Sequence, residues 1–152
     1  MNNTPNTNPH TPLPPITPGQ ARIGIFDSGY GGLTILRQIQ EKDWKPEVRH
    51  QVRGGSGDTV FNHIYSKGSE LNPNMRLFAK LVLKPGCSIG HHVHENEDEI
   101  YYILSGTAET DDNGVKRVLH PGDSTLTRSG EGHSLANIGT DDLELIATIV
   151  SY

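Results

Sequence analysis

Turns rich in glycine and proline interrupt the chain at short, regular intervals beyond Trp44, and this spacing restricts its fold more than any other feature. The 17 glycines and 10 prolines among 152 residues disfavour long helices, because both residue types penalise helix interiors. The spacing instead predicts about eight to ten short strands in a closed sandwich or barrel. The turns are RGGSG (53–57), KPG (84–86), DDNG (111–114), HPGD (120–123) and SGEG (129–132).

The segments between these turns carry strand patterns. Every second residue of Met75–Leu83 is apolar, so one face of that strand is apolar. Residues 99–104 (EIYYIL) and Leu143–Ser151 (LELIATIVS) are rich in β-branched or aromatic residues, which favour strands. The sequence DDNG lies between two strand runs and predicts a hairpin turn. We therefore expect an all-β domain over residues 44–152.

Composition excludes several classes of protein. The formal charge is −5, with 18 acidic against 13 basic residues and no Lys/Arg cluster, so we expect no nucleic-acid partner. No apolar run reaches the ~18 residues of a membrane span, and the first twenty residues lack a secretory signal pattern. We expect a cytoplasmic protein without a membrane partner. The single cysteine, Cys87, excludes an intrachain disulfide and Cys-rich metal sites.

Two segments precede the expected β domain. Residues 1–20 hold six of the ten prolines among Asn and Thr, which predicts a disordered tail. Residues 21–43 read as a βα-like fragment: the run RIGIFD (22–27), the turn SGYGG (28–32) and apolar residues at helical spacing over 33–42.

Residues 22–40 of this fragment resemble the N-terminus of glutamate racemases through RIGIFDSGYGGLTILRQI. In that family the Asp and Ser of FDSG, here Asp27 and Ser28, lie at the active site. The family also uses two catalytic cysteines, whereas this chain holds only Cys87, in different surroundings. We therefore interpret the fragment as a fusion remnant or docking element and expect no racemase activity.

Histidine and glutamate spacing indicates a metal site. His92 and His94 are two residues apart, so on a strand both imidazoles project from the same face. Glu99 begins the next expected strand, and His133 opens another after the turn SGEG. Three imidazoles and one carboxylate can bind a first-row divalent metal and leave coordination positions open for water or substrate.

The same residues stand in two motifs that resemble those of the cupin family, G-x5-H-x-H-x4-E-x6-G over 86–106 and G-x5-R-x-G-x2-H-x3-N over 122–137. One departure is Arg128, where the family usually has a proline that shapes a turn. The resemblance spans roughly residues 47–152. Within the family, the sequence is similar to small members labelled oxalate-decarboxylase-like. It implies a double-stranded β-helix (jelly-roll-like) barrel, a homodimer, a small-molecule ligand and one divalent transition metal (Mn, Fe, Ni, Co, Cu or Zn) held by His92, His94, Glu99 and His133.

Strand parity adds two candidate catalytic residues. If Glu99 faces the interior, Tyr101 does too, so Tyr101 is either a pocket residue or a core tyrosine. Arg76, like Lys80, lies opposite the apolar stripe of its strand and could supply a cation for a carboxylate substrate, or be a surface charge.

The remaining polar residues near the motif have simpler interpretations. We expect His91 on the face opposite the ligands, Cys87 to be a packing residue, and Glu95, Glu97 and Asp98 to form a solvated acidic turn.

Three functions remain open on this sequence. The first is a metal-dependent cupin enzyme acting on a small carboxylated or polyhydroxylated metabolite by decarboxylase-, isomerase- or dioxygenase-type chemistry. The second is a non-catalytic, metal-dependent module that binds a small ligand. The third is a racemase-related remnant without activity.

Overall fold

The computed structural model describes residues 46–152. The expected tail, the βα-like fragment with Asp27 and Ser28, and the start of the β domain at Trp44 lie outside the described residues. Among the described residues there is no helix of the length and apolarity that a membrane span requires.

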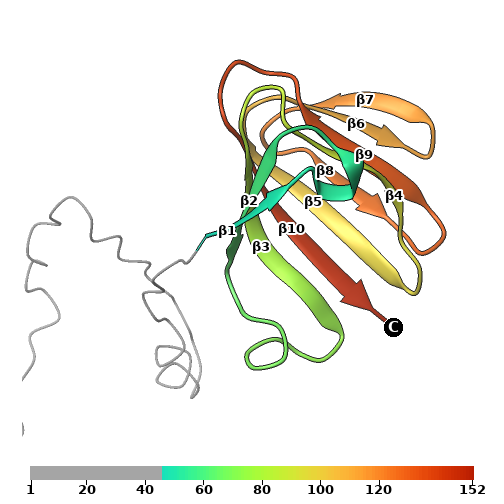
Figure 1. Cartoon of the computed structure of the whole chain (residues 1–152). Helices are drawn as coiled ribbons and strands as arrows, with labels where there is room; N and C mark the ends of the chain where they lie inside the picture. The colour runs from blue at the N-terminus through green and yellow to red at the C-terminus, as the bar shows by residue number, and fades with distance from the viewer. Residues whose placement is uncertain (1–45) are drawn as a thin grey trace, which may run out of the picture. The chain divides into compact units, whose positions relative to one another are not determined.

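The described part of the chain consists of strands and one short 3-10 turn (Figure 1). The strand bounds match the predicted segments closely: Met75–Leu83 and Leu143–Ser151 are strands as expected, and the third begins two residues earlier, at Glu97. The elements are β1 (Glu47–His50), η1 (Val52–Gly54), β2 (Asp58–His63), β3 (Met75–Leu83), β4 (Ser88–Val93), β5 (Glu97–Ser105), β6 (Ala108–Asp112), β7 (Val115–Leu119), β8 (Ser124–Thr127), β9 (Gly132–Asn137) and β10 (Leu143–Ser151).

The strands form two antiparallel sheets, which confirms the predicted all-β class. One sheet has six strands in the order β1-β2-β3-β10-β5-β8, and the other has four in the order β4-β9-β6-β7. Figure 1 shows β3, β10 and β5 lying side by side, with β4, β9, β6 and β7 as the second layer. Strands distant in sequence therefore become neighbours, as in a jelly roll.

The core lies between the sheets because side chains alternate along each strand. In β5 Tyr101 and Ile103 are 2% and 0% exposed, whereas Ile100 and Tyr102 between them are 42% and 46% exposed. The inward parity predicted for Tyr101 is confirmed here, and in β9 Leu135 and the Asn137 side chain are likewise buried. The remaining buried apolar residues of the core are Phe61, Ala79, Leu81, Leu83, Ile89, Ala108, Leu119, Leu143, Leu145 and Ala147.

The predicted hairpin at DDNG is also present. Asp112 of β6 pairs with Val115 of β7, so the loop consists of Asn113 and Gly114. Both loop residues have positive φ, 51° and 82°, as a tight two-residue hairpin turn requires. Asn and Gly tolerate this conformation better than other residues, and this preference is why the turn was visible in the sequence.

Candidate metal centre

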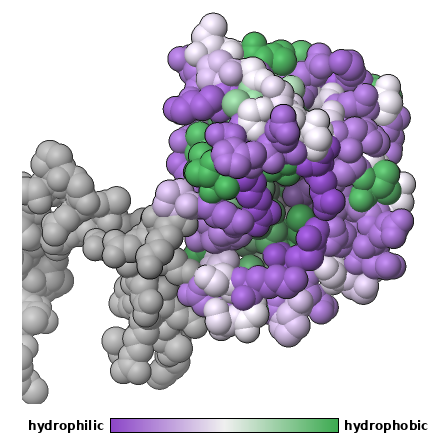
Figure 2. All heavy atoms as spheres, in the orientation of Figure 1, coloured by the Kyte–Doolittle hydropathy of each residue, from purple (hydrophilic) through white to green (hydrophobic). Residues whose placement is uncertain are grey.

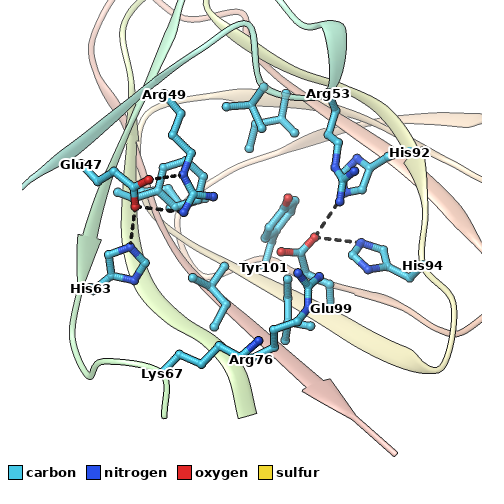
Figure 3. A pocket seen from close by; sticks show the side chains of 16 residues that line it. Glu47, Arg49, Arg53, His63, Lys67, Arg76, His92, His94, Glu99 and Tyr101 are labelled. Carbon is cyan, nitrogen blue, oxygen red and sulfur yellow. Dashed lines mark hydrogen bonds and ion pairs between the residues drawn. The ribbon is translucent and has the colours of Figure 1, made fainter. Parts of the chain in front are cut away.

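The structure brings the four residues predicted as metal ligands together. One donor atom from each of His92, His94, Glu99 and His133 lies within 4.8 Å of the others. His92 on β4 and His133 on β9 are directly paired across the four-stranded sheet, and His94 follows the end of β4. Glu99 projects from β5 of the six-stranded sheet (Figure 3). The cluster therefore joins the two sheets at one end of the core.

The donor atoms are arranged around Glu99 Oε2. This oxygen lies 3.0 Å from His133 Nε2, 3.1 Å from His94 Nε2 and 3.7 Å from His92 Nε2. The Nε2 of His133 lies 3.1 Å from that of His94 and 3.3 Å from that of His92. Metal bonds of about 2.1 Å place neighbouring donors roughly 3.0 Å apart in an octahedron and roughly 3.4 Å apart in a tetrahedron. The spacing of the cluster fits both.

The second ring nitrogen of each histidine has its own partner. His92 Nδ1 donates to the carbonyl oxygen of Gly90 at 2.9 Å, and His94 Nδ1 donates to Glu97 Oε1 at 2.8 Å. His133 Nδ1 lies 2.9 Å from the hydroxyl of Thr127. The carbonyl and carboxylate partners fix the tautomers of His92 and His94 and direct their Nε2 lone pairs toward a metal, and the Thr127 hydroxyl orients the His133 ring.

These hydrogen bonds test whether the site suits a cation. With their protons on Nδ1, His92 and His94 turn Nε2 lone pairs toward a carboxylate oxygen, and His133 does the same when the Thr127 hydroxyl accepts from its Nδ1. Glu99 Oε2 is accordingly buried without a hydrogen-bond partner among the described residues. Lone pairs crowded at this distance repel one another unless a positive charge lies between them. The donor set and its geometry fit a divalent metal.

The cluster also shifts the pKa values of its members. Burial would raise the pKa of the Glu99 carboxyl, but the imidazoles around it, that of His133 first, outweigh burial and hold the pKa well below its usual range. The pKa of His94 is raised, first by the Glu99 carboxylate and, against the effect of burial, also by Glu97. Without a metal, a proton on His94 compensates the negative charge of the site.

Tyr101 lies directly beside the ligands. Its ring is 2% exposed and stacks on the His133 imidazole, with centroids 5.0 Å apart and planes 19° apart. Burial and then the charge of Glu99 raise its pKa well above 10.0, so the phenol stays protonated at neutral pH. Tyr101 lines the cavity described below and is also part of the core cluster, so both interpretations of the sequence apply.

Glu97 does not belong to a solvated acidic turn as we expected. Its side chain is 13% exposed and lies between His94 and Arg76, whose guanidinium forms a two-pronged ion pair with the carboxylate. Arg76 also lines the cavity, but its charge is compensated by this pair. β5 begins at Glu97, two residues before Glu99, so both side chains project to the same inward face. A predicted strand that began at Glu97 would have revealed this orientation. Lys80 pairs with Glu144 instead, at 3.0 Å.

A cavity of about 340 Å³ borders three of the four candidate ligands, His92, His94 and Glu99, and hydrophilic residues surround the hollow visible in Figure 2. Besides Arg76, the cavity is lined by charged residues that the sequence did not single out: Glu47, Arg49, Arg53, His63 and Lys67. They come from β1, η1, β2 and the loop after β2 (Figure 3). No local pattern marks them, because their meeting depends on how the strands stack.

Two of these residues flank Glu47. Arg49 lies 2.7 Å and His63 lies 3.0 Å from the carboxylate, and the Arg49 guanidinium also lies over the Phe61 ring at 4.1 Å from its centroid. The hydrogen bond from Arg49, followed by that from His63, lowers the pKa of Glu47 from 4.5 to about 2. His63 is thus part of the cavity wall.

Two antiparallel sheets with three histidines and a glutamate at one end of the core define a cupin. Residues 79–149 match the family model described as a cupin domain, and the chain belongs to the cupin family. Among its relatives, the oxalate-binding protein of Thermotoga maritima is 43% identical over 112 residues, which cover 74% of this chain and 92% of the relative.

Solved structures give the same result. The crystal structure of a predicted oxalate decarboxylase from Thermotoga maritima superposes with a TM-score of 0.69 at 43% identity, covering 72% of this chain and 95% of that one. KdgF from Halomonas sp. is similar with a TM-score of 0.54 at 20% identity, over 70% of this chain and 86% of that one. This second likeness concerns the fold alone.

Proposed function

We propose that this protein binds a small dicarboxylate of the oxalate type at a divalent metal ion held by His92, His94, Glu99 and His133. The observation that carries the proposal is the position of this cluster: it forms part of the wall of a cavity rich in cationic side chains. The Thermotoga maritima relative, named an oxalate-binding protein, supports the choice of ligand.

The chemistry of the cavity suits an anion. Four protein donors leave two positions free on a six-coordinate ion, and the two oxygens of a chelating carboxylate ligand can take them. A bound ion would supply positive charge to the ligand oxygens as a Lewis acid. Arg53 and Lys67, the two cations of the wall without an ion pair in the described range, add positive charge on the open side. A volume of about 340 Å³ is at the lower end for small-molecule pockets, which suits a compact ligand.

The test begins with elemental analysis of the purified full chain, followed by calorimetric titration of the metal-loaded protein with oxalate. We expect one metal per chain and saturable binding of oxalate that disappears in the metal-free protein. His94→Ala should lose most of the metal, and His91→Ala, an exposed neighbour, should keep it. Stoichiometric metal in the His92→Ala/His94→Ala double variant would overturn the proposal.

A second candidate function is catalysis on the bound carboxylate. It is supported by the Glu47–His63 pair, an acid/base couple that lines the same cavity beyond the four ligands. His63 could deliver or accept a proton while Glu47 holds the imidazole in place. Following oxalate loss with the metal-loaded protein tests this: turnover should fall in His63→Gln but not in His120→Gln, whose imidazole lies outside the cavity wall. Absence of turnover in the unaltered protein contradicts catalysis and leaves the binding function.

A further inference from the structure

Arg53 differs from the other arginines of the cavity wall in its electrostatic partners. Arg49 is paired with Glu47, and Arg76 with Glu97. Arg53 forms no ion pair with any residue of the described range 46–152, although its guanidinium points into the cavity on the side of His92 (Figure 3). Its positive charge also acts on the buried Tyr101 hydroxyl, where it partly offsets the rise in pKa. An unpaired arginine at this place is available to an anionic ligand.

The backbone that carries Arg53 is strained. Within η1 and its N-cap, Arg53 has φ 56° and Gln51 has φ 45°, both in the left-handed region that side-chain-bearing residues seldom adopt. Strain of this kind persists where the surrounding structure enforces it, and it concentrates at ligand-binding sites. Three backbone hydrogen bonds close the turn: Gln51 N to Gly57 O, Gly54 N to Gln51 O, and Gly55 N to Val52 O.

The strained turn is locked onto the strand that carries His92. A Cβ atom at Gly90 would collide with the carbonyl oxygen of Arg53, and one at Gly55 would collide with that of Ser88. The same Gly90 accepts the hydrogen bond that orients the His92 imidazole. One point of the backbone therefore positions both the cation and a metal ligand, so that the distance between them is set by the fold.

We infer that Arg53 is the specificity-determining residue of the cavity, which selects ligands with a second carboxylate by a two-pronged ion pair to the oxygens that do not face the metal. The inference rests on the proposed function. The planar guanidinium fits a carboxylate through two parallel hydrogen bonds, which a monoanionic chelator without the second carboxylate cannot accept in the same way. Lys67, the other cation of the cavity wall without an ion pair in the described range, lies on an exposed loop and lacks this fixed position.

The experiment compares two chelators of similar size on the metal-loaded full chain: oxalate, a dianion, and glycolate, a monoanion. Arg53→Gln should raise the Kd of oxalate about 10- to 100-fold, the loss expected for hydrogen bonds to a charged group, and the Kd of glycolate less than about threefold. Arg53→Lys should retain part of the selectivity, because it keeps the charge without the fork. Arg117→Gln on the exposed surface of β7 is the matched control and should change neither value.

Folding and metal content are measured on the same samples. Arg53→Gly should lose oxalate selectivity without lowering the unfolding midpoint, because glycine adopts positive φ without strain. Equal losses of oxalate and glycolate affinity, or an unchanged oxalate Kd in Arg53→Gln, would overturn the inference while leaving the proposed function intact. If the unaltered metal-loaded protein does not bind oxalate, the proposed function fails, and the inference with it.

Discussion

The Nδ1 of His94 donates a hydrogen bond to Glu97 Oε1 over 2.8 Å, and Glu97 is in turn held by the guanidinium of Arg76. This chain of three side chains extends from the candidate metal centre to the cavity wall. It fixes the imidazole of His94 with Nε2 facing the other donors. Residues that bind no metal therefore shape the site.

Replacing Glu97 should weaken metal binding without removing a ligand. We expect Glu97→Gln to lower metal affinity about 10- to 100-fold, because the orienting hydrogen bond to His94 loses its charge and Arg76 loses its partner. Competition against a coloured chelator measures the affinity. Glu95→Gln, an exposed neighbour two residues away, serves as control. Equal affinities in the two variants would show that Glu97 does not support the metal centre.

Metal affinity should rise as the pH increases through the titration range of His94. The pKa of His94 is raised by Glu99 first and also by Glu97, so in the metal-free protein His94 keeps its proton to higher pH than an ordinary histidine. Below that pKa a metal must displace the proton, and above it the metal binds a free lone pair. Titrations with metal at several pH values, which also record proton release, check the sign. Affinity that is constant over this range would contradict the expectation.

Gly90 should tolerate no side chain. In Gly90→Ala the added Cβ would press against the backbone of Arg53 and Gly55, so the turn and β4 must separate. We expect a loss of about 1–3 kcal/mol in the free energy of unfolding, together with weaker metal binding through His92. Chemical denaturation and elemental analysis measure the two effects. At Gly139 the nearest atoms to an added Cβ lie at 3.4–3.5 Å, so Gly139→Ala should be nearly neutral.

The β domain should not need the segments before it. A shortened chain starting at Trp44 should fold and bind metal like the full chain, since both motifs and all four candidate ligands lie beyond that residue. Thermal unfolding and metal content of the two chains provide the comparison. An insoluble or metal-free product would mean that residues 1–43 contribute to the core or to an interface.

The homodimer implied by the family resemblance stays a prediction. Exposed apolar side chains cover the outer face of β5 and β8, where Ile100, 42% exposed, is paired in register with Leu126, also 42% exposed. If this face joins two copies, Ile100→Glu should convert a particle of twice 16.6 kDa into a monomer, as light scattering would show. Val118→Glu on β7 alters an exposed apolar residue on the other sheet and should leave the mass unchanged.

The sequence by itself determined the strand class, the positions of three long strands and one hairpin, and the four candidate ligands. Each of these depends on local periodicity: two-residue alternation places His92 with His94 on one face, and the turn chemistry of Asn113 and Gly114 sets the hairpin. Such short-range patterns do not depend on what the strand packs against.

Only the tertiary structure decided what surrounds those ligands. The order of strands brings Thr127 to His133 and carries the Arg53 turn against Gly90, although the residues of this second pair are far apart in the sequence. These contacts arise from the stacking of two sheets, which no short-range pattern encodes. The orientation of the imidazoles and the charge of the cavity are therefore properties of the assembled fold.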